Sequence, residues 1–173
     1  MVVAIVWLST GLVGAQQPLS DQQMKAAFVL NFVRYTEWPE RSFGGPDAPL
    51  VVCVFGDSPG SGLAGIAGKV IKNRPVQVRG IVTAEEARAC HALFVAEFDA
   101  RRFVGVLRAL QSIPVLTISE ADGFIDVGGM IGLVHFENRL QFEVNLGVVQ
   151  QAQLKASSQL LRLAHNVIEA RPH

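Results

Sequence analysis

The sequence carries little charge and no excess of either sign. Its 15 basic and 15 acidic residues cancel, and charged residues make up only 17% of the chain. No run of five like charges occurs. Nucleic acids and anionic membrane surfaces are bound through clustered basic residues, so neither is an expected partner. Half of the residues are hydrophobic, which is the composition of a folded globular protein.

The sequence also lacks the common histidine-based metal-binding motifs. No HxxxH or HExxH pattern occurs, and two thiols without paired histidines cannot close a zinc site. Asp57 and Asp99 each follow an expected strand, as in the acidic pocket of a receiver domain, but no lysine follows the later strand. We therefore expect no enzyme, no metal and no cofactor.

The N-terminal stretch Met1–Ala15 is apolar and uncharged, and it ends abruptly at Gln16. It is too short to cross a bilayer as a helix. Its small-residue ending is one that a signal peptidase accepts, although a basic residue at the start is missing. We interpret residues 1–15 as a signal peptide and residues 16–173 as one exported domain. A buried first strand is the alternative.

Only two cysteines are present, Cys53 and Cys90. An even number of cysteines in an exported chain favours a disulfide. The bridge would close a loop of about 37 residues, which in the chain-entropy model stabilises the fold by about 4 kcal/mol. Two buried free thiols are the alternative.

The strongest pattern in the sequence is a hairpin over Gly128–Leu146. In its second half, apolar residues alternate with polar ones, the two-residue period of a half-buried strand. Met130–Phe136 forms the other strand, and the turn is Glu137-Asn138-Arg139, where asparagine tolerates a left-handed backbone. The polar face of the second strand consists of Gln141, Glu143 and Asn145.

The remaining segments alternate between helices and strands. Ser20 and Gln23 form a capping box for a helix that ends near Glu37, and Thr83 and Glu86 form a second one. Further helices are expected over Asp99–Leu110, Gly147–Ala152 and Ser157–Ile168, and strands over Leu50–Phe55, Val76–Val82, Ala92–Ala96 and Val115–Ser119. This order predicts an α/β fold: a three-layer α/β/α domain whose mostly parallel sheet carries a C-terminal antiparallel hairpin at its edge.

Six blocks in this order resemble the YfiR family of periplasmic proteins. They are KAAFVLNFVRYTEWP (Lys25–Pro39), VVCVFGDSP (Val51–Pro59), ACHALFVA (Ala89–Ala96), PVLTISEADGF (Pro114–Phe124), GGMIGLVHFENRLQFEVNL (Gly128–Leu146) and LKASSQLLRLA (Leu154–Ala164). The resemblance covers nearly the whole chain after residue 15, and the joint occurrence of the blocks makes it specific.

The resemblance implies a periplasmic, non-enzymatic regulator. Such proteins restrain an inner-membrane diguanylate cyclase, YfiN, by binding its periplasmic part, which lowers cyclic di-GMP and biofilm formation. It further implies a homodimer and aligns Cys53 and Cys90 with one cysteine pair of the family. A second pair near the hairpin is missing here, so redox switching attributed to that pair does not carry over.

Two sites are therefore predicted, one for each function. A docking patch for the cyclase would use the turn and the polar face of the hairpin, that is Glu137, Asn138, Arg139, Gln141, Glu143 and Asn145, although a merely solvated strand face is the alternative. If the protein is instead a periplasmic small-molecule sensor, its ligand would lie beyond the carboxyl ends of the strands, near Gly56–Gly62, Glu97–Ala100 and Ser119–Gly123.

Overall fold

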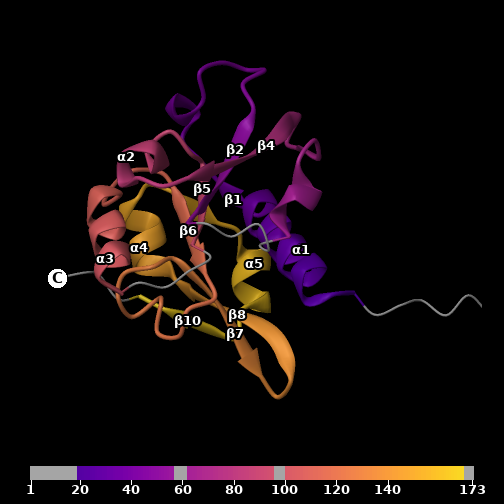
Figure 1. The fold of residues 1–173 in the computed structure, drawn as a ribbon, viewed down its shortest axis with the longest axis vertical. Helices are drawn as coiled ribbons and strands as arrows, with labels where there is room; N and C mark the ends of the chain where they lie inside the picture. The colour runs from indigo at the N-terminus through magenta and orange to yellow at the C-terminus, as the bar shows by residue number, and fades with distance from the viewer. Residues whose placement is uncertain (1–18, 57–61, 96–99, 170–173) are drawn as a thin grey trace, which may run out of the picture.

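A curled sheet of eight strands forms the centre of the molecule. The structure is a computed structural model that describes residues 19–56, 62–95 and 100–169. The expected signal peptide, Asp57 and Asp99 lie outside these residues. The order of the strands is β10-β8-β7-β6-β5-β2-β4-β3, and five of the seven neighbouring pairs are parallel. This arrangement is the predicted α/β fold with a mostly parallel sheet (Figure 1).

The elements have the following bounds. The helices are α1 (Asp21–Arg34), η1 (Glu40–Ser42), η2 (Leu63–Ile66), α2 (Ala84–Ala87), α3 (Ala100–Ala109), α4 (Leu146–Gln151) and α5 (Ser158–Leu163). The strands are β1 (Thr36–Glu37), β2 (Leu50–Phe55), β3 (Val70–Ile71), β4 (Arg74–Ile81), β5 (Ala92–Val95), β6 (Leu116–Ser119), β7 (Ile131–Phe136), β8 (Arg139–Asn145), β9 (Lys155–Ala156) and β10 (Asn166–Ile168).

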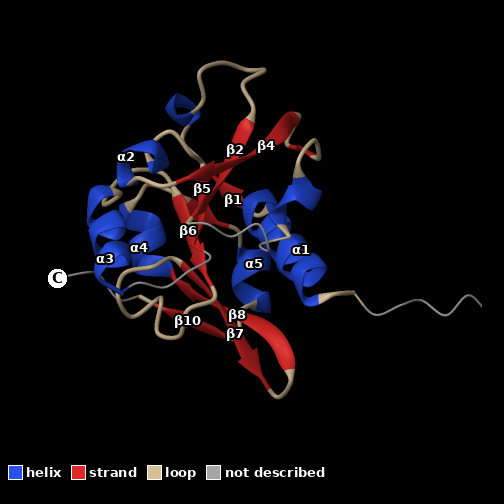
Figure 2. Ribbon diagram, viewed as in Figure 1, coloured by secondary structure: helices blue, strands red, loops and turns tan. Residues whose placement is uncertain are grey.

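Helices cover both faces of the sheet, with α1 and α5 on one side and α2 and α3 on the other (Figure 2). All six residues of β2 are buried, because its side chains alternate between two hydrophobic clusters. Val52 packs in the cluster that contains residues of α1, and Cys53 packs in the cluster that contains residues of α3. The continuous apolar run in the sequence therefore correctly predicted a strand that is covered on both faces.

Local capping signals fix the start of two helices. The Ser20 hydroxyl accepts a hydrogen bond from the Gln23 N–H, while the Gln23 side chain accepts one from the Ser20 N–H. Thr83 and Glu86 repeat this arrangement at α2. Hydrogen bonds from the Val82 N–H and from Thr83 also lower the pKa of the Glu86 carboxyl. Both predicted capping boxes are confirmed.

Two predicted helix ends are wrong for one physical reason. The first helix ends at Arg34 instead of near Glu37, and Thr36–Glu37 pairs with Lys155–Ala156 as β1 and β9. The last helix ends at Leu163 instead of Ile168, and Asn166–Ile168 pairs in parallel with β8 as β10. In both places the local sequence pattern is that of a helix. The backbone N–H and C=O groups there form hydrogen bonds with a distant strand instead. Strand β10 is therefore the outermost strand on this side of the sheet, next to β8 of the hairpin.

The predicted disulfide is present between Cys53 in β2 and Cys90 just before β5. Their Cα atoms are 6.0 Å apart, and 37 positions separate them in the sequence. Cys53 is fully buried, and Cys90 is nearly so. The bridge therefore joins two adjacent parallel strands within the apolar core, beside the pairing of Val52 with Ala92.

His91, the residue after Cys90, has a structural role. Its Nδ1 accepts a hydrogen bond from the Val51 N–H at 3.0 Å, so its Nε2 carries the proton and donates to the Ser42 carbonyl at 3.0 Å. Its ring stacks on Phe43, with centroids 4.4 Å apart. Burial lowers the pKa of His91, and the Arg74 guanidinium lowers it further, against the opposite effect of the bond to Ser42. The fold therefore holds the neutral imidazole.

Removing the disulfide is expected to destabilise the fold by about 4 kcal/mol, because the bridge removes loop-closure entropy from the unfolded chain. Urea denaturation of the variant Cys53→Ala/Cys90→Ala beside the oxidised parent measures this difference. A thiol reductant should move the parent's unfolding midpoint toward that of the variant and leave the variant unchanged. Equal midpoints for the parent and the variant would contradict the stabilising role.

Acid is expected to destabilise the fold through His91. The imidazole titrates near 6.5 when unfolded and at a lower pH when folded, so its contribution to stability is complete above about pH 6.5 and is lost as the pH falls through the folded pKa. The free energy of unfolding, measured between pH 7.5 and 5, should fall less steeply in His91→Gln than in the parent. An identical slope in the parent and the variant would rule out this role of His91.

Candidate functional site

The hairpin of β7 and β8 has a two-residue turn at Glu137 and Asn138. Both residues have a left-handed backbone, with φ of 49° and 59°. Two successive residues of this kind give the turn whose twist matches that of the flanking strands. Arg139, predicted as part of the turn, is instead the first residue of β8 and pairs with Phe136. Figure 1 shows that the hairpin extends beyond the rest of the molecule.

One face of the hairpin is anchored on α1. The Phe142 ring lies edge-on against two rings of that helix, with centroids 5.9 Å from Phe28 and 4.9 Å from Phe32. Val144, two residues further along β8, has no exposed surface. Aromatic packing of this kind buries a large apolar area and restricts the orientation of the strand. The base of the hairpin is therefore held firmly in the core.

The opposite face of the hairpin is only partly exposed to solvent. Asn145, predicted as a docking residue on this face, is buried, so that prediction is wrong. Asn145 is 1% exposed, because Ile125 lies over it. Its Nδ2 donates to the Ile125 carbonyl at 3.0 Å, and its Oδ1 accepts from the Val148 N–H at 3.3 Å, capping α4. The alternating pattern placed Asn145 on the polar face correctly, but a segment distant in sequence covers it. Asn145 therefore supports the fold and does not belong to a docking surface.

The other five predicted residues lie together on the outer part of the hairpin. Glu137, Asn138 and Arg139 are exposed, and Gln141 and Glu143 are partly exposed. Within the described residues, none of their side chains takes part in a hydrogen bond or an ion pair. A partner could therefore bind their polar groups without breaking a hydrogen bond or an ion pair within the described residues.

Phe136 adds an apolar centre to this group and was missed in the sequence. It is 44% exposed, and its ring lies 4.5 Å from that of His165, centroid to centroid. Cross-strand partners share a face of the sheet, so Phe136 lies beside Arg139. An aromatic residue immediately before the predicted turn was the signal that could have identified it. We use the term hairpin surface for Phe136, Glu137, Asn138, Arg139, Gln141 and Glu143.

The predicted small-molecule site beyond the carboxyl ends of the strands gains little support from the residues that the structure describes. Residues 57–61 and 96–99 lie outside the described residues. Ser119 is buried, its hydroxyl donates to the Val95 carbonyl at 3.1 Å, and it accepts from the Ala121 N–H at 3.1 Å. Both bonds hold the chain where it leaves β6, so Ser119 has a structural role.

Metal binding and membrane crossing find no support in the part of the chain that is described. There, no group of three or more His, Cys, Asp and Glu side chains is placed to hold a metal ion. His135 on the hairpin has one acidic neighbour, Asp21, with the imidazole Nε2 and a carboxylate oxygen 4.0 Å apart. None of the helices between residues 19 and 169, outside the two gaps, combines the length and apolar character needed to cross a bilayer.

Solved structures similar to this chain show its fold alone. One is the ABC domain in complex with L-Trp from Streptococcus pneumonia, at 14% identity and a TM-score of 0.50, covering 68% of this chain and 55% of that one. Another is a conserved domain protein from Vibrio cholerae O1 biovar eltor, at 10% identity and a TM-score of 0.51, covering 83% of this chain and 60% of that one. This chain thus spans little more than half the length of either.

The family comparison is more specific, because it covers the sequence blocks and the hairpin together. The family model described as YfiR/HmsC-like matches residues 22–165. The matched region begins in α1, includes the disulfide and the whole hairpin, and ends just before β10. The chain belongs to the YfiR/HmsC-like family.

Proposed function

We propose that this protein is a periplasmic, non-catalytic regulator that binds the periplasmic part of an inner-membrane diguanylate cyclase and represses it. Repression would lower cyclic di-GMP and biofilm formation. Membership of the YfiR/HmsC-like family supports this function. The structural observation that carries it is the hairpin surface, which presents Phe136 among polar side chains that have no partner within the described chain.

The hairpin surface has the composition of a small docking site. Aromatic residues and arginine are the side chains most often responsible for binding energy at protein interfaces. Phe136 and Arg139 are paired neighbours, and Glu137 and Glu143 supply negative charge close by. The expected partner surface is an apolar pocket with a carboxylate placed for Arg139 and a cation placed for Glu143.

Repression requires only that the protein binds one state of the cyclase better than another. If the protein binds the inactive state more tightly, the conformational equilibrium of the cyclase shifts toward that state without any chemical step. A rigid hairpin suits this purpose, because little conformational entropy is lost on binding. Packing of Phe142 against Phe28 and Phe32 provides the rigidity at its base.

A periplasmic location is consistent with the disulfide, because oxidising compartments preserve such bridges. Export would use residues 1–15 as a signal peptide, after which no insertion into the membrane is expected. A homodimer, the state implied by the family resemblance, is part of the same proposal. A periplasmic small-molecule sensor acting on another membrane partner is the second candidate. A cavity of about 550 Å³, lined in part by α3 and α4, favours it.

Reversing the charge of Glu143 is expected to abolish repression. The variant Glu143→Lys places a cation opposite a cation of the partner, which should cost about 2 kcal/mol, or about 30-fold in affinity. Cellular cyclic di-GMP, measured in a deletion strain that carries the variant gene, should remain as high as in the deletion strain alone. The gene for the parent protein should restore the low level.

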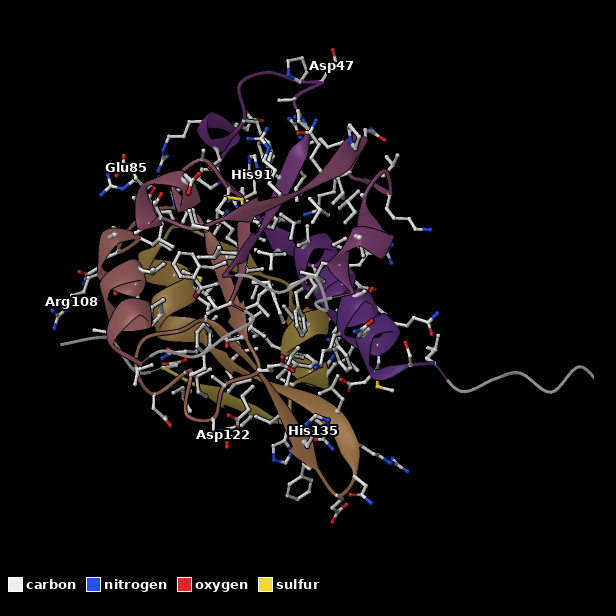
Figure 3. The ribbon with its side chains drawn as sticks, viewed as in Figure 1. Asp47, Glu85, His91, Arg108, Asp122 and His135 are labelled. Atoms are coloured by element: carbon white, nitrogen blue, oxygen red, sulfur yellow. A yellow bond between two sulfur atoms is a disulfide. The ribbon has the colours of Figure 1, made fainter. Side chains whose placement is uncertain are left out.

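Asp47→Lys is the matched control, because Asp47 is exposed and lies at the end of the molecule opposite the hairpin, on which His135 is labelled (Figure 3). It changes the net charge by the same amount and should repress as the parent does. Equal thermal unfolding of the two variants would establish that both are folded. Full repression by Glu143→Lys would remove the hairpin surface from the interface.

A further inference from the structure

Strand β10 is an open edge of the eight-stranded sheet. It stands last in the strand order, with β8 on one side, and no other strand of the described residues pairs with it. Asn166 and Val167, two of its three residues, are exposed. An open edge of this kind presents backbone N–H and C=O groups that can pair with a strand of another chain.

The backbone groups of Val167 point away from β8. The Asn145 N–H donates to a carbonyl just before β7, so Asn145 faces β7 and its neighbour Val144 faces β10. Val144 has Val167 as its register partner, and in a parallel pair its hydrogen bonds go to the residues on either side of that partner. Asn166 and Ile168 therefore face β8, and Val167 between them directs its N–H and C=O outward.

The two edges of the sheet differ in their protection against other chains. Edge strands are commonly shielded by lysine or proline residues. Strand β3, at the other edge, is flanked by Lys69 and Lys72. Strand β10 contains neither residue type, and Val167 at its centre is 38% exposed. The β10 edge therefore lacks the protection that the β3 edge has.

Exposed apolar side chains lie along the segment that leads into this edge. Leu163, the last residue of α5, is 66% exposed and lies four residues before Val167. His165 lies between them in the sequence, and its ring contacts that of the exposed Phe136. Burial of such side chains is the main favourable term when proteins associate. The edge thus offers apolar contacts together with unpaired backbone groups.

We infer that β10 pairs antiparallel with β10 of a second copy of this chain, with the two Val167 residues opposite each other. Because the same strand lies on both sides, the contact has two-fold symmetry and closes as a dimer. In this register His165 lies opposite Glu169 of the partner subunit, so that an imidazole faces a carboxylate twice across the interface. The inference rests on the homodimer of the proposed function and identifies its interface.

Charge exchange at Val167 tests this register. Val167→Lys places two cations opposite each other, and Val167→Glu places two anions there. Sedimentation equilibrium of the purified oxidised chain, over about a hundredfold range of concentration, should show a monomer–dimer equilibrium in the parent. Each variant alone should associate about fivefold more weakly. An equal mixture of the two should regain the parent's association, because each cation then faces an anion.

Val70→Lys is the matched control, because Val70 is the exposed valine of β3 at the opposite edge. It makes the same change in net charge and should associate as the parent does. Recovery in the mixture also establishes that both Val167 variants are folded. A dimer that both variants keep, or a mixture that fails to recover, would overturn the pairing through β10.

A parent that stays monomeric at every concentration would also overturn the inference and would leave the edge to a strand of another protein. That result would remove the homodimer from the proposed function without affecting cyclase binding. Cyclase binding is tested separately by the cyclic di-GMP level with Glu143→Lys, so the two failures are distinguishable.

Discussion

The pairing register of β7 and β8 is the constraint on which the rest of this molecule depends. The left-handed turn at Glu137 and Asn138 fixes Phe136 opposite Arg139. Because side chains alternate between faces, a slip of one residue would exchange the two faces of β8. Phe142 would then leave the rings of α1, and Asn145 would no longer cap α4. One turn thus determines what the core holds and what the surface presents.

Strand β8 also organises the elements that follow it. Its outer edge pairs with β10, and its last residue, Asn145, caps α4. The disulfide has a comparable role between β2 and β5, in another part of the sheet. The molecule is therefore stabilised at two separate places. The tip of the hairpin is left to face a partner, while its base remains part of the core.

Local patterns in the sequence predicted the features that depend on neighbouring residues. The capping residues Ser20 and Thr83, the buried strand β2 and the hairpin itself are of this kind. The errors concern contacts between distant segments. Strand β10 forms because β8 offers an open edge, and Asn145 is buried because Ile125 lies over it. The cavity depends on how α3 packs beside α4, and no spacing in the sequence encodes that arrangement.

The most direct test of the account is to map the surface of this protein that contacts a diguanylate cyclase. The purified periplasmic segment of a membrane diguanylate cyclase from the same cells would be titrated into the ¹⁵N-labelled chain. We expect amide signals of residues 134–143 to shift or broaden first, with saturation, while those around Asp47 stay unchanged. Saturable binding that perturbs other residues and leaves the hairpin unaffected would contradict the account.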